Sequence, residues 1–129
     1  MGSMTEGKTL ACAILVLAIG FGCVGSPRER SREHRDRAEA WLKAGKLQEA
    51  SVEYQAALQR DPSDAGTLFG LAQVLDLLGN QEECARTLRR TIAADPGHKA
   101  ARLRLGEISL RAGKYSETLA LARQPGARY

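Results

Sequence analysis

The 129-residue sequence contains few cysteines and few aromatic residues. Its three cysteines cannot all pair with one another, and they form neither a C-x-x-C motif nor a Cys/His cluster with metal-ligand spacing. These absences exclude a disulfide framework and a zinc site. Aromatic residues make up 5% of the chain, which is too few for a surface that stacks nucleic-acid bases. The net charge of +4 is too small to indicate a nucleic-acid partner by itself.

Signs of β-structure are also scarce. After residue 23 the β-branched aliphatic residues are Val24, Val52, Val74, Ile92 and Ile108. Helix-forming Leu, Ala, Arg, Glu and Gln fill most other positions. The sequence therefore predicts an all-α fold.

Catalytic motifs are missing as well. The chain has no G-x-S-x-G and no H-E-x-x-H. His34 and His98 have no nucleophile or carboxylate placed beside them by a recognisable motif, and Cys84 occupies a small-residue position typical of a buried structural thiol. We predict that the protein is not an enzyme and uses no metal, cofactor or small-molecule substrate.

One nucleotide-binding signature is present near the start. Residues 2–9, GSMTEGKT, match the Walker A pattern G-x-x-x-x-G-K-[ST]. A P-loop needs a strand before it, whereas here only Met1 precedes the match. Residues 10–21 are apolar on every face, unlike a helix on a solvated sheet. We interpret the match as accidental.

The N-terminal segment has the layout of a secretory signal peptide: a polar start carrying Lys8, an apolar run and then small residues. Residues 19–23, IGFGC, resemble the lipobox of bacterial lipoproteins, in which the cysteine is lipidated and becomes the new N-terminus. Gly20 departs from the leucine that is usual there. We expect a signal peptide over 1–22 and a lipidated Cys23, short tether and helix start over 23–30. An uncleaved anchor helix and simple secretion are the alternatives.

The tether predicted between the lipid and the folded domain is short. Ser26 suits the cap of a helix that begins at Pro27, so only Val24, Gly25 and Ser26 follow Cys23, a reach of roughly 10–14 Å. We expect the domain to be held against a membrane of the cell envelope, facing the periplasm. By resemblance to lipoproteins, valine rather than aspartate after the cysteine favours the outer membrane.

A fixed period of 34 residues organises the rest of the chain. It relates Gly45, Gly79 and Gly113, and it relates Pro62 to Pro96. A period of this length predicts stacked helical hairpins. The units align as 31–64, 65–98 and 99–123, which together form the array 31–123 and leave a tail over 124–129.

Each unit reads as two helices. In the second, Leu68, Leu71, Ala72 and Leu75 follow the spacing of one helical stripe, and Gly79 ends the helix. Asn80 and Glu83 predict a capping box for the next helix. In the basic run over residues 28–37, the pairs Glu33–Arg37 and Arg32–Asp36 have the spacing of ion pairs along one helix.

With these residues in place, the sequence resembles the tetratricopeptide repeat family. The resemblance implies a short α-solenoid of about three helical hairpins. His34, Leu68 and Arg102 stand where the family usually has tryptophan. The matching residues are Ala38, Trp41, Gly45, Ala50, Tyr54, Ala57, Pro62, Leu71, Ala72, Leu75, Gly79, Leu88, Pro96, Leu105, Gly106 and Gly113.

The family resemblance also implies a function. The first helix of each unit would line a groove that receives an extended peptide or a helix from a protein partner. The groove residues implied here are Arg32, Arg35, Glu39, Lys43, Phe69, Gln73, Asp76, Leu103, Glu107 and Arg111. The family's carboxylate clamp wants asparagine where Glu39 and Gln73 stand, so we do not expect this groove to bind a terminal carboxylate.

The third unit predicts an additional surface. Its second helix, at about residues 116–123, is followed by Gln-Pro-Gly, and a solenoid end normally needs a polar cover. We therefore expect Leu119, Leu121 and Ala122 to be partly exposed, as a possible edge for self-association. The leading hypothesis is an envelope-tethered adaptor or assembly factor, similar in layout to pilotin lipoproteins. The alternative is a self-associating structural subunit of an envelope complex, anchored by an uncleaved N-terminal helix.

Overall fold

The computed structural model describes residues 25–123, and every regular element in that range is an α-helix. The predicted all-α fold is therefore confirmed. The proposed signal peptide over 1–22, Cys23 and the tail over 124–129 lie outside the described residues. The helices are α2 (Pro27–Lys43), α3 (Leu47–Arg60), α4 (Ala65–Leu77), α5 (Gln81–Ala94), α6 (Lys99–Arg111) and α7 (Tyr115–Arg123).

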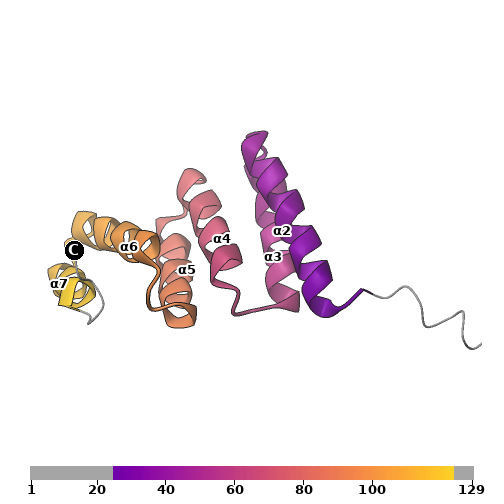
Figure 1. Cartoon of the computed structure of the whole chain (residues 1–129). Coiled ribbons are helices and arrows are strands. Elements are labelled where there is room, and N and C mark those ends of the chain that lie inside the picture. Colours follow the sequence, from indigo (N-terminus) through magenta and orange to yellow (C-terminus); the bar gives the residue numbers. More distant parts are fainter. Residues whose placement is uncertain (1–24, 124–129) are drawn as a thin grey trace, which may run out of the picture.

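The helices form three antiparallel hairpins, α2–α3, α4–α5 and α6–α7, that follow one another in a single array (Figure 1). The second helix of each hairpin also packs against the first helix of the next: α3 contacts α4, and α5 contacts α6. Each unit therefore packs mainly on its neighbours, as expected for a solenoid. None of the helices within residues 25–123 is both long and apolar enough to cross a lipid bilayer.

The turn inside each hairpin is built on one glycine. Gly45, Gly79 and Gly113 have φ values of 74°, 81° and 72°, a left-handed conformation that glycine adopts without steric cost. In the first turn, the Gly45 N–H donates to the Leu42 carbonyl, and the next N–H donates to the Trp41 carbonyl. The same two bonds recur at the other two glycines. This is the Schellman ending of a helix, repeated every 34 residues.

The helix starts differ from one another. Ser26 and Glu29 form a capping box at the start of α2, as predicted for the Ser26 cap. The predicted capping box at α5 is wrong, because the Asn80 side chain makes no capping hydrogen bond. The Glu83 carboxylate instead pairs with Arg86 at 3.2 Å, while the Gln81 side-chain amide donates to Asp76 of the preceding helix at 2.8 Å.

Small residues let the two helices of a hairpin approach closely. Ala38 of α2 and Ala50 of α3 are fully buried, and so is Cys84 of α5 beside Ala72 of α4. The core continues from these pairs through the three hairpins. The helix α7 contains no buried residue, so the third hairpin is the most open of the three. The predicted inward stripe of α4 is confirmed, since all four of its residues are buried.

Candidate functional site

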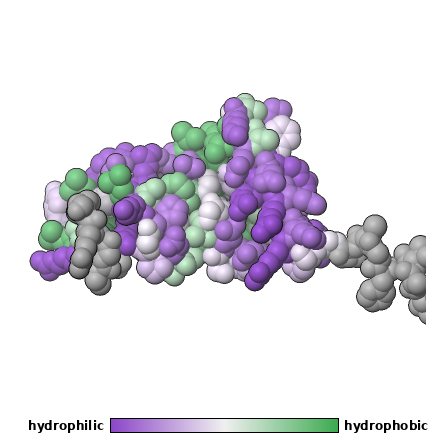
Figure 2. Space-filling view, in the orientation of Figure 1, coloured by the Kyte–Doolittle hydropathy of each residue, from purple (hydrophilic) through white to green (hydrophobic). Residues whose placement is uncertain are grey.

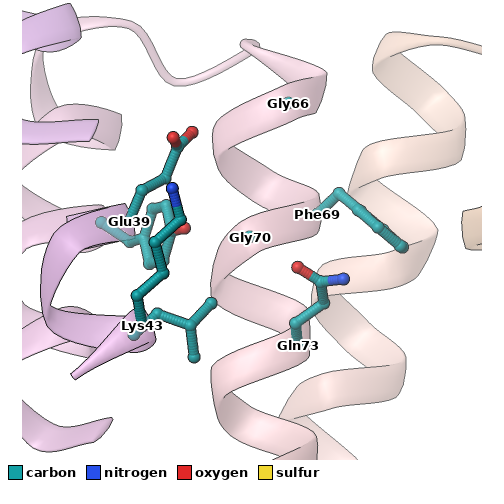
Figure 3. Close-up of a pocket in the computed structure, with 8 residues that line it drawn as sticks. Glu39, Lys43, Gly66, Phe69, Gly70 and Gln73 are labelled. Atoms are coloured by element: carbon teal, nitrogen blue, oxygen red, sulfur yellow. The ribbon is translucent and has the colours of Figure 1, made fainter. Parts of the chain in front are cut away.

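A hollow of about 300 Å³ opens between α2 and α4, on the side formed by the first helices of the units. We call it the α2–α4 hollow. Figure 3 shows the side chains of α2 reaching toward α4 across it. Four residues implied as groove residues by the sequence lie together here, and four further residues complete the lining. The first four are Glu39, Lys43, Phe69 and Gln73, and the others are Leu42, Tyr54, Gly66 and Gly70.

The floor of the hollow depends on a close contact between α3 and α4. A Cβ atom added at Gly70 would lie 2.6 Å from two carbons of the Tyr54 ring and 2.8 Å from its hydroxyl oxygen. The glycine therefore leaves room for the ring, and the ring fills the space that a side chain on α4 would otherwise occupy. Burial, together with the negative charge of Glu39, raises the pKa of the Tyr54 hydroxyl. The sequence analysis placed Tyr54 in the core and did not identify its part in the groove.

The rim of the hollow is polar and carries both signs of charge. Glu39 and Lys43 rise from α2, and Gln73 faces them from α4 (Figure 3). The Phe69 ring turns toward the next hairpin, where it lies 4.7 Å, centroid to centroid, from the imidazole of His98. The rim thus offers hydrogen-bond donors and acceptors around an apolar floor.

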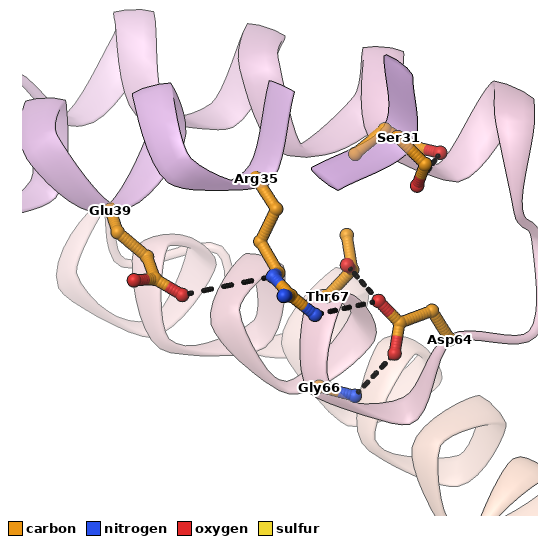
Figure 4. Close-up of polar contacts among 7 residues, drawn as sticks. Ser31, Arg35, Glu39, Asp64, Gly66 and Thr67 are labelled. Carbon is orange, nitrogen blue, oxygen red and sulfur yellow. Dashed lines mark hydrogen bonds and ion pairs between the residues drawn. The ribbon is translucent and has the colours of Figure 1, made fainter. Parts of the chain in front are cut away.

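Arg35 lies beside the hollow but is occupied by the protein itself. Its guanidinium donates to the Asp64 carboxylate at 3.3 Å and lies 4.0 Å from Glu39 (Figure 4). Asp64 is the N-cap of α4, because it also accepts hydrogen bonds from the Gly66 N–H at 3.3 Å and the Thr67 hydroxyl at 2.5 Å. Arg35 therefore fastens α2 to the start of α4. Arg32, one turn earlier, is exposed and does not line the hollow.

The corresponding space between α4 and α6 is occupied by an arginine. A step of 34 residues takes Gly70 to Arg104, whose guanidinium bonds to Asp76 of α4 and pairs with Glu107 at 3.0 Å. Burial opposes the ionisation of Asp76, but hydrogen bonds from Gln81 and Arg104 outweigh it and lower the pKa of that carboxyl. Asp76 and Glu107, implied as groove residues, thus belong to a bridge between repeats.

The same step relates two other contacts between units. Arg35 and Asp64 of the first interface correspond to Phe69 and His98 of the second. An ion pair has therefore been replaced by a pair of rings at the same place in the array. His98 also caps α6, since its Nδ1 accepts from the Ala101 N–H at 3.1 Å. No sequence motif marked the ring contact, although the period alone could have indicated it.

The remaining residues implied as groove or edge lie at the far end of the array. Leu103 and Arg111 are exposed on α6. On α7, Leu119 is 56% exposed and Ala122 is also exposed. Leu121 instead packs against the core, so the expected edge does not include all three residues to the same degree.

The ion pairs predicted along α2 are wrong. Arg37 lies 3.7 Å from Glu53 of α3, and its Nε donates to the backbone carbonyl of Glu33 rather than to its carboxylate. His34 contacts the same Glu53 carboxylate at 2.7 Å. The carboxylate of the neighbouring helix is half-buried, so it holds both side chains better than an exposed acid on α2 could.

The described residues offer little for chemistry. Cys84 is fully buried, its thiol donates to the Ala72 carbonyl at 3.2 Å, and burial together with the charge of Asp76 raises its pKa to about 11. A thiol with this pKa is not a nucleophile at neutral pH. Within residues 25–123, no group of His, Cys, Asp and Glu side chains is arranged to hold a metal ion.

Two sequence models of one family match this chain. Tetratricopeptide repeat models match residues 41–96 and residues 82–127, so the matches together cover most of the array just described. The chain belongs to the tetratricopeptide repeat family. U-box domain-containing protein 70 of Oryza sativa subsp. japonica is 31% identical over 93 residues, which are 72% of this chain and 12% of that protein. The chain spans less than a quarter of the length of the curated relatives it matches.

Solved tetratricopeptide repeat structures have the same fold. The Arabidopsis OM64 TPR domain has a TM-score of 0.68 at 20% identity, with 75% of this chain and 80% of that domain covered. The second TPR of Spaghetti (RPAP3), bound to the HSP90 peptide SRMEEVD, has a TM-score of 0.67 at 21% identity, covering 73% and 87%. At these identities the likeness concerns the fold.

Proposed function

We propose that this tetratricopeptide repeat chain is a protein-interaction adaptor and that the α2–α4 hollow binds a segment of its partner. The observation that carries the proposal is the open space left by Gly70 between two repeats, where the equivalent Arg104 occupies the next space. Open, mostly apolar hollows with a few polar groups are the usual form of binding sites. The RPAP3 domain, which shares the fold, is described as bound to a peptide.

The chemistry of the hollow suggests which segment it takes. Leu42 and the Tyr54 ring provide an apolar floor, while Glu39, Lys43 and Gln73 supply a rim of both charges. This favours an internal segment with one apolar side chain and polar neighbours. A terminal carboxylate fits poorly, because the Glu39 carboxylate stands at the rim and would repel it.

The proposal includes attachment to the cell envelope. Because α2 begins at Pro27 with Ser26 as its cap, only three residues separate Cys23 from the folded array. A lipid on Cys23 would therefore keep the array beside the membrane, and its partner would be membrane-associated. The lipobox-like sequence is the support for this step.

Crosslinking tests the binding site. A photoreactive residue placed at Gln73 should crosslink the partner in cells, whereas the same residue at Gln55, an exposed glutamine of α3, should not. The charge reversals Glu39→Lys and Lys43→Glu should each reduce the Gln73 crosslink. Equal crosslinking from both glutamines would refute a binding site in the hollow.

A separate experiment tests the anchor. The intact mass of the protein purified from its host should correspond to a chain that begins at a lipid-modified Cys23. The variant Cys23→Ala should leave the membrane fraction. An unchanged membrane pool, or a mass that retains the first residues without lipid, would refute the tether and leave the hollow unaffected.

A further inference from the structure

The outer face of the last hairpin corresponds to a surface that is covered in the other two. Ser51 and Tyr54 of α3 are 8% and 2% exposed, and the residues 34 positions later, Ala85 and Leu88 of α5, are 8% and 0% exposed. In both units the first helix of the next hairpin packs against this helix. The next step of 34 reaches Leu119 and Ala122 on α7, both of which are exposed.

The helix α6 extends the same exposed surface. Leu103 and Leu110 are 67% and 54% exposed, and their spacing of seven residues places them on one side of the helix. Figure 2 shows hydrophobic surface over this part of the array. We name the α6–α7 face by its four apolar residues, Leu103, Leu110, Leu119 and Ala122.

The charge around this face is strongly basic. Residues 99–123 contain six lysines and arginines and two glutamates. Both glutamates are already paired within the chain, Glu107 with Arg104 at 3.0 Å and Glu117 with Arg89 at 2.7 Å. Exposed Arg111 and Lys114 at the α6–α7 turn border the face. A partner that covers these leucines would therefore meet positive charge.

We propose that the α6–α7 face is a second binding surface, separate from the α2–α4 hollow, and that it docks an acidic amphipathic helix of a partner protein. A helix is the expected shape because a helix covers the equivalent surface in both earlier units. Acidic flanks complement Arg111 and Lys114, while apolar residues cover the leucines.

A second copy of this chain fits the face less well. If its α2 stacked there in the register of the array, it would present the residues 34 positions before Thr67 and Gly70. These are Glu33 and Asp36, which are exposed and charged. Placing two carboxylates on Leu119 and Ala122 would cost desolvation energy without an apolar gain.

The test uses the full-length chain in a neutral detergent and two fluorescent peptides of about 18 residues, long enough for five helical turns. Both peptides carry the same leucine stripe, flanked by glutamates in one and by lysines in the other. Fluorescence anisotropy should show the acidic peptide binding at least about tenfold more tightly. Leu119→Glu should weaken it by about tenfold or more, while Val52→Glu, on the 65% exposed Val52 of α3, should not.

Three results would overturn the proposal. One is equal binding of both peptides, or binding that Leu119→Glu leaves unchanged. Another is loss of binding in Gln73→Arg but not in Leu119→Glu, which would assign the peptide to the α2–α4 hollow. The third is a dimer in sedimentation equilibrium that Leu119→Glu dissociates, because the face would then belong to a second copy.

Discussion

The contact between Gly70 and Tyr54 makes an unusual stability prediction: alanine at this helical glycine should destabilise the protein. Alanine in place of glycine inside a helix ordinarily gains roughly 0.5–1 kcal/mol, because glycine loses more backbone entropy on folding. At position 70, however, the new methyl group would lie 2.6 Å from two carbons of a ring that is 2% exposed. A buried ring of this size has no open space into which to move.

The expected magnitude follows from these opposing effects. Overpacking a well-packed core costs about 1–3 kcal/mol, and subtracting the helix gain leaves a net loss of about 1–2 kcal/mol. For a domain of about 100 residues this lowers the melting temperature by about 4–8 °C for each kcal/mol. Gly106 of α6 is the matched control, because a Cβ there would meet no atom within 4 Å. Gly106→Ala should raise the melting temperature.

Thermal and urea denaturation followed by circular dichroism would measure both variants. The cause can be checked with Tyr54→Leu, which removes the ring from the contact. Tyr54→Leu should cost less in the Gly70→Ala background than in the wild type, with a coupling energy of about 1 kcal/mol or more. If Gly70→Ala stabilises the protein as much as Gly106→Ala, the close contact is not present and our account of the hollow is wrong.

Three further predictions concern single side chains. Because the pKa of Asp76 is lowered from 3.8 in the fold, its ionised form should add stability above about pH 4 that disappears as the pH falls through the lowered folded value, and Asp76→Asn should flatten the acid side of a stability–pH curve. His98→Ala should lower the free energy of unfolding by about 1–2 kcal/mol in urea denaturation, since it removes the α6 cap and the ring contact, whereas His98→Asp should keep the cap and lose less. Cys84 should resist iodoacetamide at pH 8 in the native protein and react in denaturant, as read by mass spectrometry of its peptide, because it is fully buried with a pKa of about 11; rapid native labelling would contradict this.

Local features were predictable because their causes are local. The 34-residue spacing of Gly45, Gly79 and Gly113 indicated three hairpin turns, and all three glycines have the left-handed conformation that such turns require. The stripe containing Leu68 and Leu75 indicated the buried side of α4. Both signals depend only on helical geometry and on the conformational freedom of glycine.

Side-chain partners were harder to predict because competing partners lie on other helices. Glu83 was expected to cap its own helix, but it pairs with Arg86. Arg37 was expected to pair along α2, but the nearest carboxylate is that of Glu53 on α3. Sequence spacing shows which groups can meet within one helix, and it does not show which groups a neighbouring helix brings closer.

The groove illustrates both sides of this division. The repeat period placed Glu39, Lys43, Phe69 and Gln73 on the first helices of two units, and the structure brings these four residues to one hollow. Whether a space between repeats is open or filled was decided by packing between hairpins. Gly70 admits the Tyr54 ring beside one open space, whereas an arginine side chain fills the next.

By itself, the sequence determined the helices, their turns and the family, because these depend on interactions within about one helical turn and on a period that the chain repeats. The tertiary structure decided which of the implied groove residues face solvent and which fasten one repeat to the next. That outcome depends on distances between side chains of different hairpins, which no spacing along the chain specifies.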